Sequence, residues 1–249
     1  MDRERQTASY HVGSGIVWDS EPAQEYAECL LKAAVLLRRR GPFSLLETMR
    51  WSPQEGYFLL GHHMDRLRDS AAYFGFVLDE AALHEALDLN ATMLDAPSKV
   101  RLLLNQAGEV SLQSSPLPAA PDLQPRRLLL AQSPIATDNI WLYHKTTRRD
   151  VYEQARAAQP GGDDVLLWNE AGFLTEATTA NIVVQLDGCL LTPPVSAGLL
   201  AGTFRRHLLH RGEIAEQPLR CSDLARSEAL FLINSVRGWQ PAILVEQIK

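Results

Sequence analysis

The stretch HKTTRRDVYEQARAAQ, residues 144–159, decides how this chain is interpreted. Its first residues are basic, and its composition from about residue 147 to 158 predicts a helix. Lys145 therefore stands just before a helix, and an acidic segment containing Glu176 follows further along the chain. A lysine beside two arginines is most often a solvated surface residue, so the stretch alone does not assign Lys145 a role.

The totals describe an ordinary soluble globular protein. The 249 residues are 46% hydrophobic and 22% charged, and the length allows one large domain or two modest ones. A net charge of −6 argues against a general nucleic-acid binder, because neutralising phosphates requires a basic face. No apolar run reaches the ~18–20 residues of a membrane span. The N-terminus MDRERQTASYH lacks the apolar core of a signal peptide, which predicts a cytoplasmic protein.

Cysteine and histidine spacing predicts no metal site. The three cysteines, Cys29, Cys189 and Cys221, are far apart and form no CxxC pair. The seven histidines include no HExxH spacing. We therefore expect neither a zinc cage nor a redox disulfide.

The hydrophobic pattern divides the chain into an atypical beginning and two small units. Residues 1–40 combine a short predicted strand, YHVGSGIVWDSEP, with a helix ended by Gly41-Pro42. Residues 43–130 are expected to form a small α+β domain, residues 131–138 a linker, and residues 139–249 a larger domain. Because helices alternate with hairpins, the predicted fold class is α+β or mixed α/β, with a cleft between two domains.

Several elements of the small domain can be predicted individually. FSLLETMRW and YFLLG are expected to be strands on either side of a QEG turn. A helix follows and ends at Gly75, and Asp79 is the expected N-cap of the next helix. A hairpin is expected around residues 106–108. Apolar residues recur at helical spacing on one face of the first helix: Met64, Leu67, Ala71 and Phe74.

The residue types suit an enzyme that uses pyridoxal phosphate. Such an enzyme needs a lysine for the Schiff base, an acid near the pyridine nitrogen and a helix N-terminus for the phosphate. Lys145, Glu176 and the helix predicted to start at Gly202 are candidates for these roles, and Arg66 is a candidate cation near the phosphate.

Four separated segments carry a family resemblance: HHMDRLRDSAAYFGF, HKTTRR, LTEATTANIVV with LLTPPVSAGLLAGTFRR, and LFLINSVRGWQPA. Together and in this order they resemble the class IV aminotransferase family, which includes branched-chain aminotransferases, D-amino-acid aminotransferases and 4-amino-4-deoxychorismate lyases. The resemblance extends from about Phe43 to Val245. It implies a two-domain pyridoxal-phosphate enzyme of fold type IV, with the cofactor in the cleft between the domains.

The resemblance implies a role for each matching residue. Lys145 matches the Schiff-base lysine, Glu176 the acid that pairs with the pyridinium nitrogen, and Arg66 the phosphate-binding arginine. Other residues match the leucine under the ring, the helix N-terminus, the structural asparagine and a hydroxyl residue that reaches the phosphate: Leu200, Gly202, Thr203, Phe204, Asn181 and Ser235. Phe204 stands where many members have a threonine, so Thr203 is expected to replace that side-chain contact.

Two features favour a lyase within the family. Thr48 follows Glu47 directly, and in the lyases a threonine at this place faces the substrate, although an ordinary strand threonine is the alternative. Residues 1–40 look like a remnant, because YHVGSGIVWDSEPAQEYAECLLKA resembles the C-terminal end of chorismate-utilising enzymes such as aminodeoxychorismate synthase component I. The resemblance implies a 4-amino-4-deoxychorismate lyase, which releases p-aminobenzoate and pyruvate for folate biosynthesis.

That reaction defines the expected catalytic and substrate contacts. Lys145 would remove the ring proton and Thr48 would assist departure of the enolpyruvyl group. The substrate carries two carboxylates, so arginines are expected near the cleft. Arg101 is the first candidate, followed by Arg50 and Arg237.

Two other functions stay open at this point. A transaminase would use the same Lys145 and Glu176 on an amino acid, and a catalytically idle protein would serve as an assembly partner of a separate synthase component. The resemblance also implies a homodimer, and an aminodeoxychorismate synthase component is a candidate partner.

Overall fold

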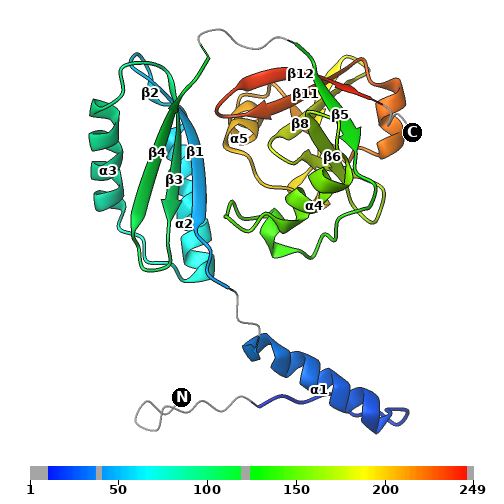
Figure 1. Cartoon of the computed structure of the whole chain (residues 1–249). Helices are drawn as coiled ribbons and strands as arrows, with labels where there is room; N and C mark the ends of the chain where they lie inside the picture. The colour runs from blue at the N-terminus through cyan, green and yellow to red at the C-terminus, as the bar shows by residue number, and fades with distance from the viewer. Residues whose placement is uncertain (1–10, 38–40, 119–123, 246–249) are drawn as a thin grey trace. The chain divides into compact units, whose positions relative to one another are not determined.

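The computed structural model describes residues 11–37, 41–118 and 124–245 (Figure 1). The chain divides into two compact units, residues 1–42 and 43–249, which are described separately. In the first unit the described residues form an irregular segment followed by helix α1 (Pro22–Leu37), whose first residue is a proline, as is common at helix starts.

The strand predicted in YHVGSGIVWDSEP does not form. Tyr10 lies outside the described residues, and residues 11–21 contain no strand: their hydrogen bonds include a local one between Val17 and Ser20 and one from the Lys32 side chain of α1 to the Gly13 carbonyl (2.9 Å). A lone extended segment has no neighbouring strand to pair its backbone groups, so an apolar pattern alone does not make it a strand. Large apolar side chains of this unit are exposed: Ile16, Val17, Trp18, Tyr26 and Leu30.

The second unit begins with a four-stranded antiparallel sheet in the order β2-β1-β3-β4. Helices α2 and α3 pack against one face of this sheet (Figure 1). The α3 N-cap is Asp79, whose side chain accepts a hydrogen bond from the Ala82 amide, and the α2 C-cap is Gly75, both as predicted. The elements are β1 (Leu45–Ser52), β2 (Gly56–Tyr57), α2 (Leu60–Phe74), α3 (Glu80–Thr92), β3 (Ser98–Leu104) and β4 (Val110–Pro116).

Alternation along β1 and β3 gives the small sheet one apolar face and one polar face. Leu45 and Met49 of β1 are fully buried and pack with Leu102 and Leu104 of β3 against the helices. Thr48 pairs with Arg101 in the antiparallel register, so both side chains project from the opposite face. That polar face forms one wall of the site described below.

The rest of the unit is built around an eight-stranded sheet of mixed direction, in the order β10-β9-β8-β11-β12-β5-β6-β7. An additional pairing of β7 with β8 closes six of these strands into a ring filled by aliphatic side chains. The strands are β5 (Arg126–Leu130), β6 (Asp164–Trp168), β7 (Leu174–Ala177), β8 (Asn181–Leu186), β9 (Cys189–Thr192), β10 (Ala215–Glu216), β11 (Ala229–Asn234) and β12 (Gly238–Leu244).

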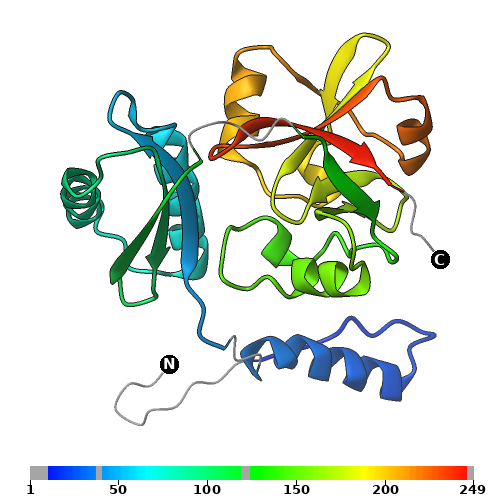
Figure 2. The same ribbon diagram turned by 45° about the horizontal axis from the view of Figure 1, so that its top comes forward.

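Two α-helices pack against the outside of this ring, as the turned view shows (Figure 2). Helix α4 (Asp150–Ala158) packs Tyr152 beside Val165 of β6, and α5 (Thr203–His210) packs Phe204 and Leu208 beside β8 and β11. Short 3-10 helices complete the unit: η1 (Ile140–Leu142), η2 (Val195–Ala197) and η3 (Cys221–Arg226). The predicted mixed α/β class is confirmed.

Two boundaries differ from the prediction. Of YFLLG only Tyr57 is in a strand, the two-residue β2 that starts at Gly56, because Leu59 adopts a left-handed conformation (φ 57°) and α2 starts at Leu60. The strand at Arg126–Leu130 was expected in the small domain, but it pairs with β6 and β12 of the large sheet. The connection between the two sheets is therefore the segment after Pro116 and before Arg126, and not residues 131–138.

Candidate active site

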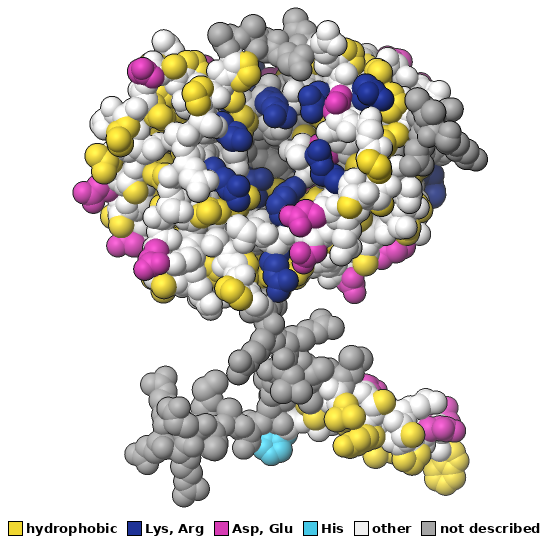
Figure 3. Space-filling model, in the orientation of Figure 1, with side chains coloured by type: hydrophobic (Ala, Val, Ile, Leu, Met, Phe, Trp, Pro, Cys, Tyr) yellow, Lys and Arg dark blue, Asp and Glu magenta, His cyan; other side chains and the backbone are white. Residues whose placement is uncertain are grey.

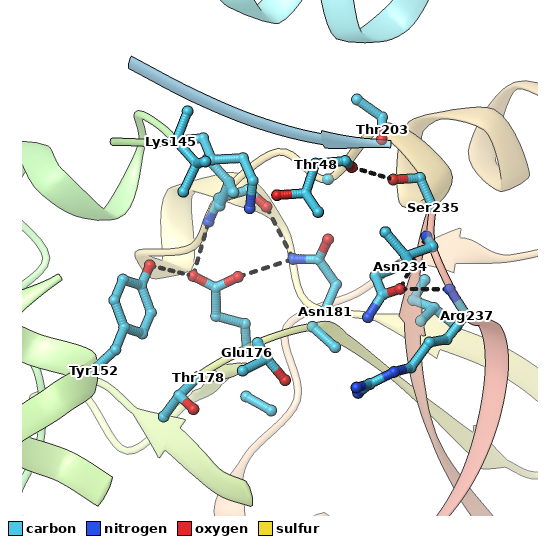
Figure 4. Close-up of a pocket in the computed structure, with 18 of the residues that line it drawn as sticks. Thr48, Lys145, Tyr152, Glu176, Thr178, Asn181, Thr203, Asn234, Ser235 and Arg237 are labelled. Carbon is cyan, nitrogen blue, oxygen red and sulfur yellow. Dashed lines mark hydrogen bonds between the residues drawn. The ribbon is translucent and has the colours of Figure 1, made fainter. Parts of the chain in front are cut away.

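A cavity of about 350 Å³ lies between the polar face of the small sheet and the larger sheet. Its walls come from β1, β3, the segment from Lys145 to Tyr152, the β7–β8 turn, the start of α5 and the β11–β12 turn (Figure 4). Segments far apart in the sequence thus meet at one place. Of the residues expected at the site, all but Phe204 and Arg50 line this cavity.

Lys145 is held at the seam between the two sheets. Its carbonyl accepts a hydrogen bond from the Leu46 amide of β1 (2.9 Å), and the Thr147 amide donates to the carbonyl of Ser44 (2.9 Å). The Thr147 hydroxyl in turn accepts from the Ser44 amide (3.0 Å). This backbone pairing fixes the position from which the lysine side chain enters the cavity.

The electrostatic surroundings favour a neutral amine at Lys145. Burial, followed by the nearby guanidinium of Arg66, lowers the pKa of Lys145 to about 8, although Glu47 and Glu176 oppose the shift. A lysine with a pKa this close to neutrality is deprotonated in an appreciable fraction of molecules near pH 7. Lys145 is therefore suited to act as a nucleophile and as a base, unlike a solvated surface lysine.

Glu176, on β7, faces Lys145 across the cavity and is 4% exposed (Figure 4). Its carboxylate accepts hydrogen bonds from the Tyr152 hydroxyl (2.7 Å), the Leu200 amide (3.1 Å) and the Asn181 side chain (3.1 Å). Burial raises the pKa of Glu176 to about 7, while the bonds from Tyr152 and Leu200 act in the opposite direction. The carboxyl group can thus share a proton with a basic ring nitrogen at neutral pH.

The elevated pKa of Glu176 predicts a measurable pH dependence of stability. A carboxyl group whose pKa rises from 4.5 to about 7 on folding stabilises the fold at low pH and loses that contribution as pH increases through this window. Glu176→Gln should therefore stabilise the cofactor-free protein relative to wild type by roughly 3 kcal/mol more at pH 8 than at pH 4.5. Urea unfolding at both pH values measures the difference. The exposed Glu153→Gln should show no such change, and a flat Glu176→Gln difference would contradict the pKa.

A buried aspartate shapes the turn between β7 and β8. Asp164 is 3% exposed and accepts hydrogen bonds from the amide and hydroxyl of Thr178 and from the hydroxyl of Thr179. The Thr178 carbonyl accepts a bond from the guanidinium of Arg149, which also lies 4.5 Å above the Tyr152 ring. The acid on β7 and the asparagine on β8 are thereby held side by side, as the register pair Glu176 and Asn181.

The N-terminus of α5 opens into the same cavity. Gly202 is its N-cap, and both Gly202 and Thr203 line the cavity. Asn181 packs so closely on Gly202 that a Cβ there would lie 1.9 Å from the asparagine Oδ1. The Asn181 side chain also donates to the Leu200 carbonyl (2.9 Å). Unpaired amides at a helix start attract anions, so this end is suited to a phosphate.

Arg66, on α2, reaches the cavity from the small sheet. Its Nε and Nη2 donate to the two carboxylate oxygens of Glu47 (2.8 and 2.6 Å), and its Nη1 donates to the Ala201 carbonyl (3.2 Å). His63 donates from Nδ1 to the same carboxylate (2.6 Å) and lies 3.3 Å from the Thr203 hydroxyl through Nε2. A positive side chain thus stands beside the start of α5.

Two predicted site residues lie elsewhere, and their expected side-chain roles are corrected. The Phe204 side chain packs in the core between α5 and β11, so only its backbone amide belongs to the helix start. Arg50 pairs with Glu55 (3.1 Å) and lies 4.3 Å over the Phe58 ring. It shares a strand face with Thr48 but lies beyond the end of the cavity, which removes it from the substrate candidates.

Several cavity or supporting residues were missed by the sequence analysis. Arg149 and Tyr152 lie within the opening stretch, and their closeness to Lys145 in the sequence was the available signal. Lys99 alternates with Arg101 on β3 and lines the same wall. No such signal marks Glu47 or His63 in the sequence. Glu47 breaks the apolar pattern of its strand, and His63 resembles a residue on the surface of a helix.

The donor set fits one cofactor. Lys145, whose pKa is lowered, provides the amine that pyridoxal phosphate needs, and the buried Glu176 provides the partner for its ring nitrogen. The N-terminus of α5 and Arg66 provide the phosphate contacts. Among the described residues, no group of three or more acidic, histidine or cysteine side chains could hold a metal ion. The fold and the site define the class of pyridoxal-phosphate enzymes.

Comparison with known proteins gives the family. Residues 44–245 match the model of "Amino-transferase class IV", and residues 2–38 match that of a chorismate binding enzyme. The chain therefore belongs to the class IV aminotransferase family and is a pyridoxal-phosphate-dependent enzyme. The first match also confirms the resemblance seen in the four sequence segments, and the second confirms the resemblance at the N-terminus.

Individual relatives agree with this assignment. The chain is 33% identical over 198 residues to the "Putative aminodeoxychorismate lyase" of Schizosaccharomyces pombe, covering 76% of this chain and 85% of the relative. It is 37% identical to the crystal structure of a "Putative amino-acid aminotransferase" from Mesorhizobium loti (TM-score 0.77; 82% and 100% covered). The 4-amino-4-deoxychorismate lyase of Pseudomonas aeruginosa is 26% identical (TM-score 0.68; 82% and 83% covered).

Within the described residues, no helix is both long enough and apolar enough to cross a membrane.

Proposed function

We propose that the chain is a 4-amino-4-deoxychorismate lyase, which releases p-aminobenzoate and pyruvate in folate biosynthesis. The observation that carries the proposal is the polar face of the small sheet, where Thr48 and Arg101 are paired in the register of β1 and β3 and both line the cavity that contains Lys145 and Glu176. This pair presents a proton donor and a carboxylate-binding cation on one surface. The relatives named as lyases support the same reaction.

The charge of the cavity suits a substrate with two carboxylates. Figure 3 shows basic side chains gathered around a hollow, on a protein whose net charge is −6. Among the described residues that line the cavity, Glu176 is the acid and the others that carry charge are cations: Arg66, Lys99, Arg101, Lys145, Arg149 and Arg237. Arginine binds carboxylates through paired hydrogen bonds, so the excess of cations favours a dianionic ligand over a neutral one.

One cation on this wall has unsatisfied hydrogen-bonding capacity. The Nε of Arg101 is buried and has no partner within the described residues. A buried donor without a partner destabilises the protein until a ligand supplies an acceptor. Arg101 is therefore the arginine best placed to receive a substrate carboxylate, ahead of Arg237, which is exposed on the β11–β12 turn.

The residues divide the chemistry among them. Pyridoxal phosphate, when bound, supplies an aldehyde that captures the substrate amine and a ring that withdraws electrons from it. Lys145, neutral at the required moment, removes the proton from the substrate carbon that bears the amine. Glu176 holds a proton at the ring nitrogen, and the Thr48 hydroxyl lies where it can protonate the departing enolpyruvyl group. Loss of that group leaves an aromatic ring, which makes the step favourable.

The test is to mix the cofactor-loaded protein with enzymatically generated aminodeoxychorismate and to quantify p-aminobenzoate and pyruvate. Equal release of both is the expected result. A transaminase is the second candidate, favoured by the 37% identity to the Mesorhizobium loti protein. It would leave aminodeoxychorismate unchanged and transfer an amino group between an amino acid and a keto acid. Absence of both activities from the loaded protein would favour the third reading, an assembly partner.

Replacing Arg101 with alanine should raise KM for aminodeoxychorismate by about 10- to 100-fold, with a smaller effect on kcat. The expected size follows from losing a charge-assisted hydrogen bond of about 1.5–3 kcal/mol. The matched control is Arg50→Ala, which removes a guanidinium from the same sheet face outside the cavity and should change KM less than twofold. Similar KM values for the two variants would exclude Arg101 as the carboxylate site.

The assembly and location of the protein are also proposals. We propose a cytoplasmic homodimer, as implied by the family resemblance, and sedimentation of the purified chain tests its mass. Residues 1–40 are proposed to be a remnant related to aminodeoxychorismate synthase component I, and such a component is the proposed partner. The match of residues 2–38 to a chorismate binding enzyme supports this origin.

A further inference from the structure

The ion pair between Glu47 and Arg66 is unusual in its placement. Glu47 is 1% exposed and lies on the apolar face of β1, between the fully buried Leu45 and Met49. Burying a carboxylate among aliphatic side chains is costly unless it is paired and hydrogen-bonded. Burial alone would raise the pKa of Glu47, but Arg66 and His63 together lower it to about 2. The carboxylate is therefore charged, and it occupies a core position that a leucine would fill at lower cost.

Within the described residues, the contacts of Arg66 leave two of its N–H bonds without a partner. A guanidinium carries five N–H bonds. The structure commits three of them, two to the Glu47 oxygens and one to the Ala201 carbonyl beside the start of α5. One N–H on each terminal nitrogen remains for a ligand. Since the two-point contact with Glu47 fixes the guanidinium plane, it also fixes the direction of these two bonds.

His63, also on α2, supports the carboxylate through a further hydrogen bond. It is 0% exposed, and burial lowers its pKa, against the attraction of Glu47. In the neutral form its Nδ1 donates to Glu47 while its Nε2 faces the Thr203 hydroxyl, a tautomer assigned from these partners. The network thereby connects β1, α2 and the first turn of α5.

We propose that Glu47 is a positioning residue for the phosphate subsite: it aims the two remaining N–H bonds of Arg66 at an anion bound on the N-terminus of α5, and His63 holds Glu47 in place. The inference rests on the proposed cofactor role of Arg66. A carboxylate next to a phosphate site weakens the attraction of the site for anions in general, so its presence is explained by orientation and not by charge. The subsite gains selectivity for a phosphate in one position.

The test compares the affinity of the cofactor-free full chain for pyridoxal phosphate with its affinity for pyridoxal, which lacks the phosphate. Glu47→Gln should lower this preference at least about tenfold, a size typical for losing a residue that orients a ligand-binding side chain. Arg66→Ala should lower it further. In the double variant Glu47→Gln should have little additional effect, because a residue that acts through Arg66 has nothing left to orient. The exposed Glu55→Gln on the same hairpin is the matched control.

The outcomes separate this inference from the cofactor assignment. A wild-type chain that binds both compounds equally would reject the phosphate subsite itself. A wild-type preference that survives Glu47→Gln, or additive effects in the double variant, would overturn the positioning role and leave the cofactor assignment intact.

A second pair of variants applies if Glu47→Gln does not fold. His63→Asn retains an N–H toward Glu47 and should keep the preference within about threefold, whereas His63→Leu should lose it. Equal preferences in the two histidine variants would also overturn the proposal. Inorganic phosphate, titrated as a competitor, reports on the same subsite without any reaction at Lys145.

Discussion

Replacing Lys145 with alanine is expected to lower the rate of p-aminobenzoate formation by at least about 10³-fold, because the residue supplies both the amine that holds the cofactor and the base. Lys145 enters the cavity from the seam with β1, opposite Glu176 (Figure 4). No other lysine of the described residues is buried in this way, since Lys32 and Lys99 are exposed. Loss of the amine should therefore find no substitute.

Two measurements check this expectation. Borohydride reduction of the loaded wild-type chain, followed by peptide mass spectrometry, should place the cofactor on the peptide containing Lys145, and the variant should carry none. Arg148→Ala is the matched control, because this neighbouring cation pairs with Asp150 and does not line the cavity. Its rate should stay within about twofold of wild type. A Lys145→Ala protein that still released p-aminobenzoate at a comparable rate would refute the assigned role.

Replacing Gly202 with alanine is expected to destabilise the fold by about 1–3 kcal/mol and to weaken cofactor binding strongly. The added Cβ would lie 1.9 Å from the Asn181 Oδ1, so either the asparagine or the start of α5 must move. Asn181 also donates to Glu176 and to the Leu200 carbonyl. The same displacement would therefore disturb the acid and the phosphate end of the site together.

Thermal unfolding with and without pyridoxal phosphate separates the two effects. Gly61→Ala is the control, because Gly61 lies in α2 with no atom within 4 Å of an added Cβ, and alanine is favoured there by helix propensity. This variant should be as stable as wild type or slightly more stable, with unchanged cofactor binding. A Gly202→Ala protein with wild-type stability and affinity would show that Asn181 can move at no cost.

The sequence was most informative where local rules and chemistry coincide. The caps Asp79 and Gly75 follow from backbone geometry, so they could be placed directly. Of the nine residues matched by family motif, only Phe204 does not line the cavity, and the other eight do: Arg66, Lys145, Glu176, Asn181, Leu200, Gly202, Thr203 and Ser235.

Tertiary information was needed where alternatives are equivalent in the sequence. Arg50 and Arg101 both lie on the polar face of adjacent strands, and only the extent of the cavity separates them. Strand β5 shows an apolar run that fits either sheet, and its pairing with β6 and β12 decides which. Glu47 occupies a position where the alternation of β1 predicts an apolar residue. The cost of burying its carboxylate is offset by Arg66 and His63, which lie on α2, so the sequence of β1 alone does not reveal it.

The seam between the two sheets also determines how a substrate can arrive. Because Leu46 and Ser44 are hydrogen-bonded to the segment around Lys145, the cleft is closed along this edge, and any opening motion has to pivot about it. Toward the other end of β1, the cavity wall includes Lys99 of β3. Together with Arg101 and Arg237, Lys99 gives the cavity a positive charge, so capture of a dianion should be accelerated by long-range attraction that salt weakens.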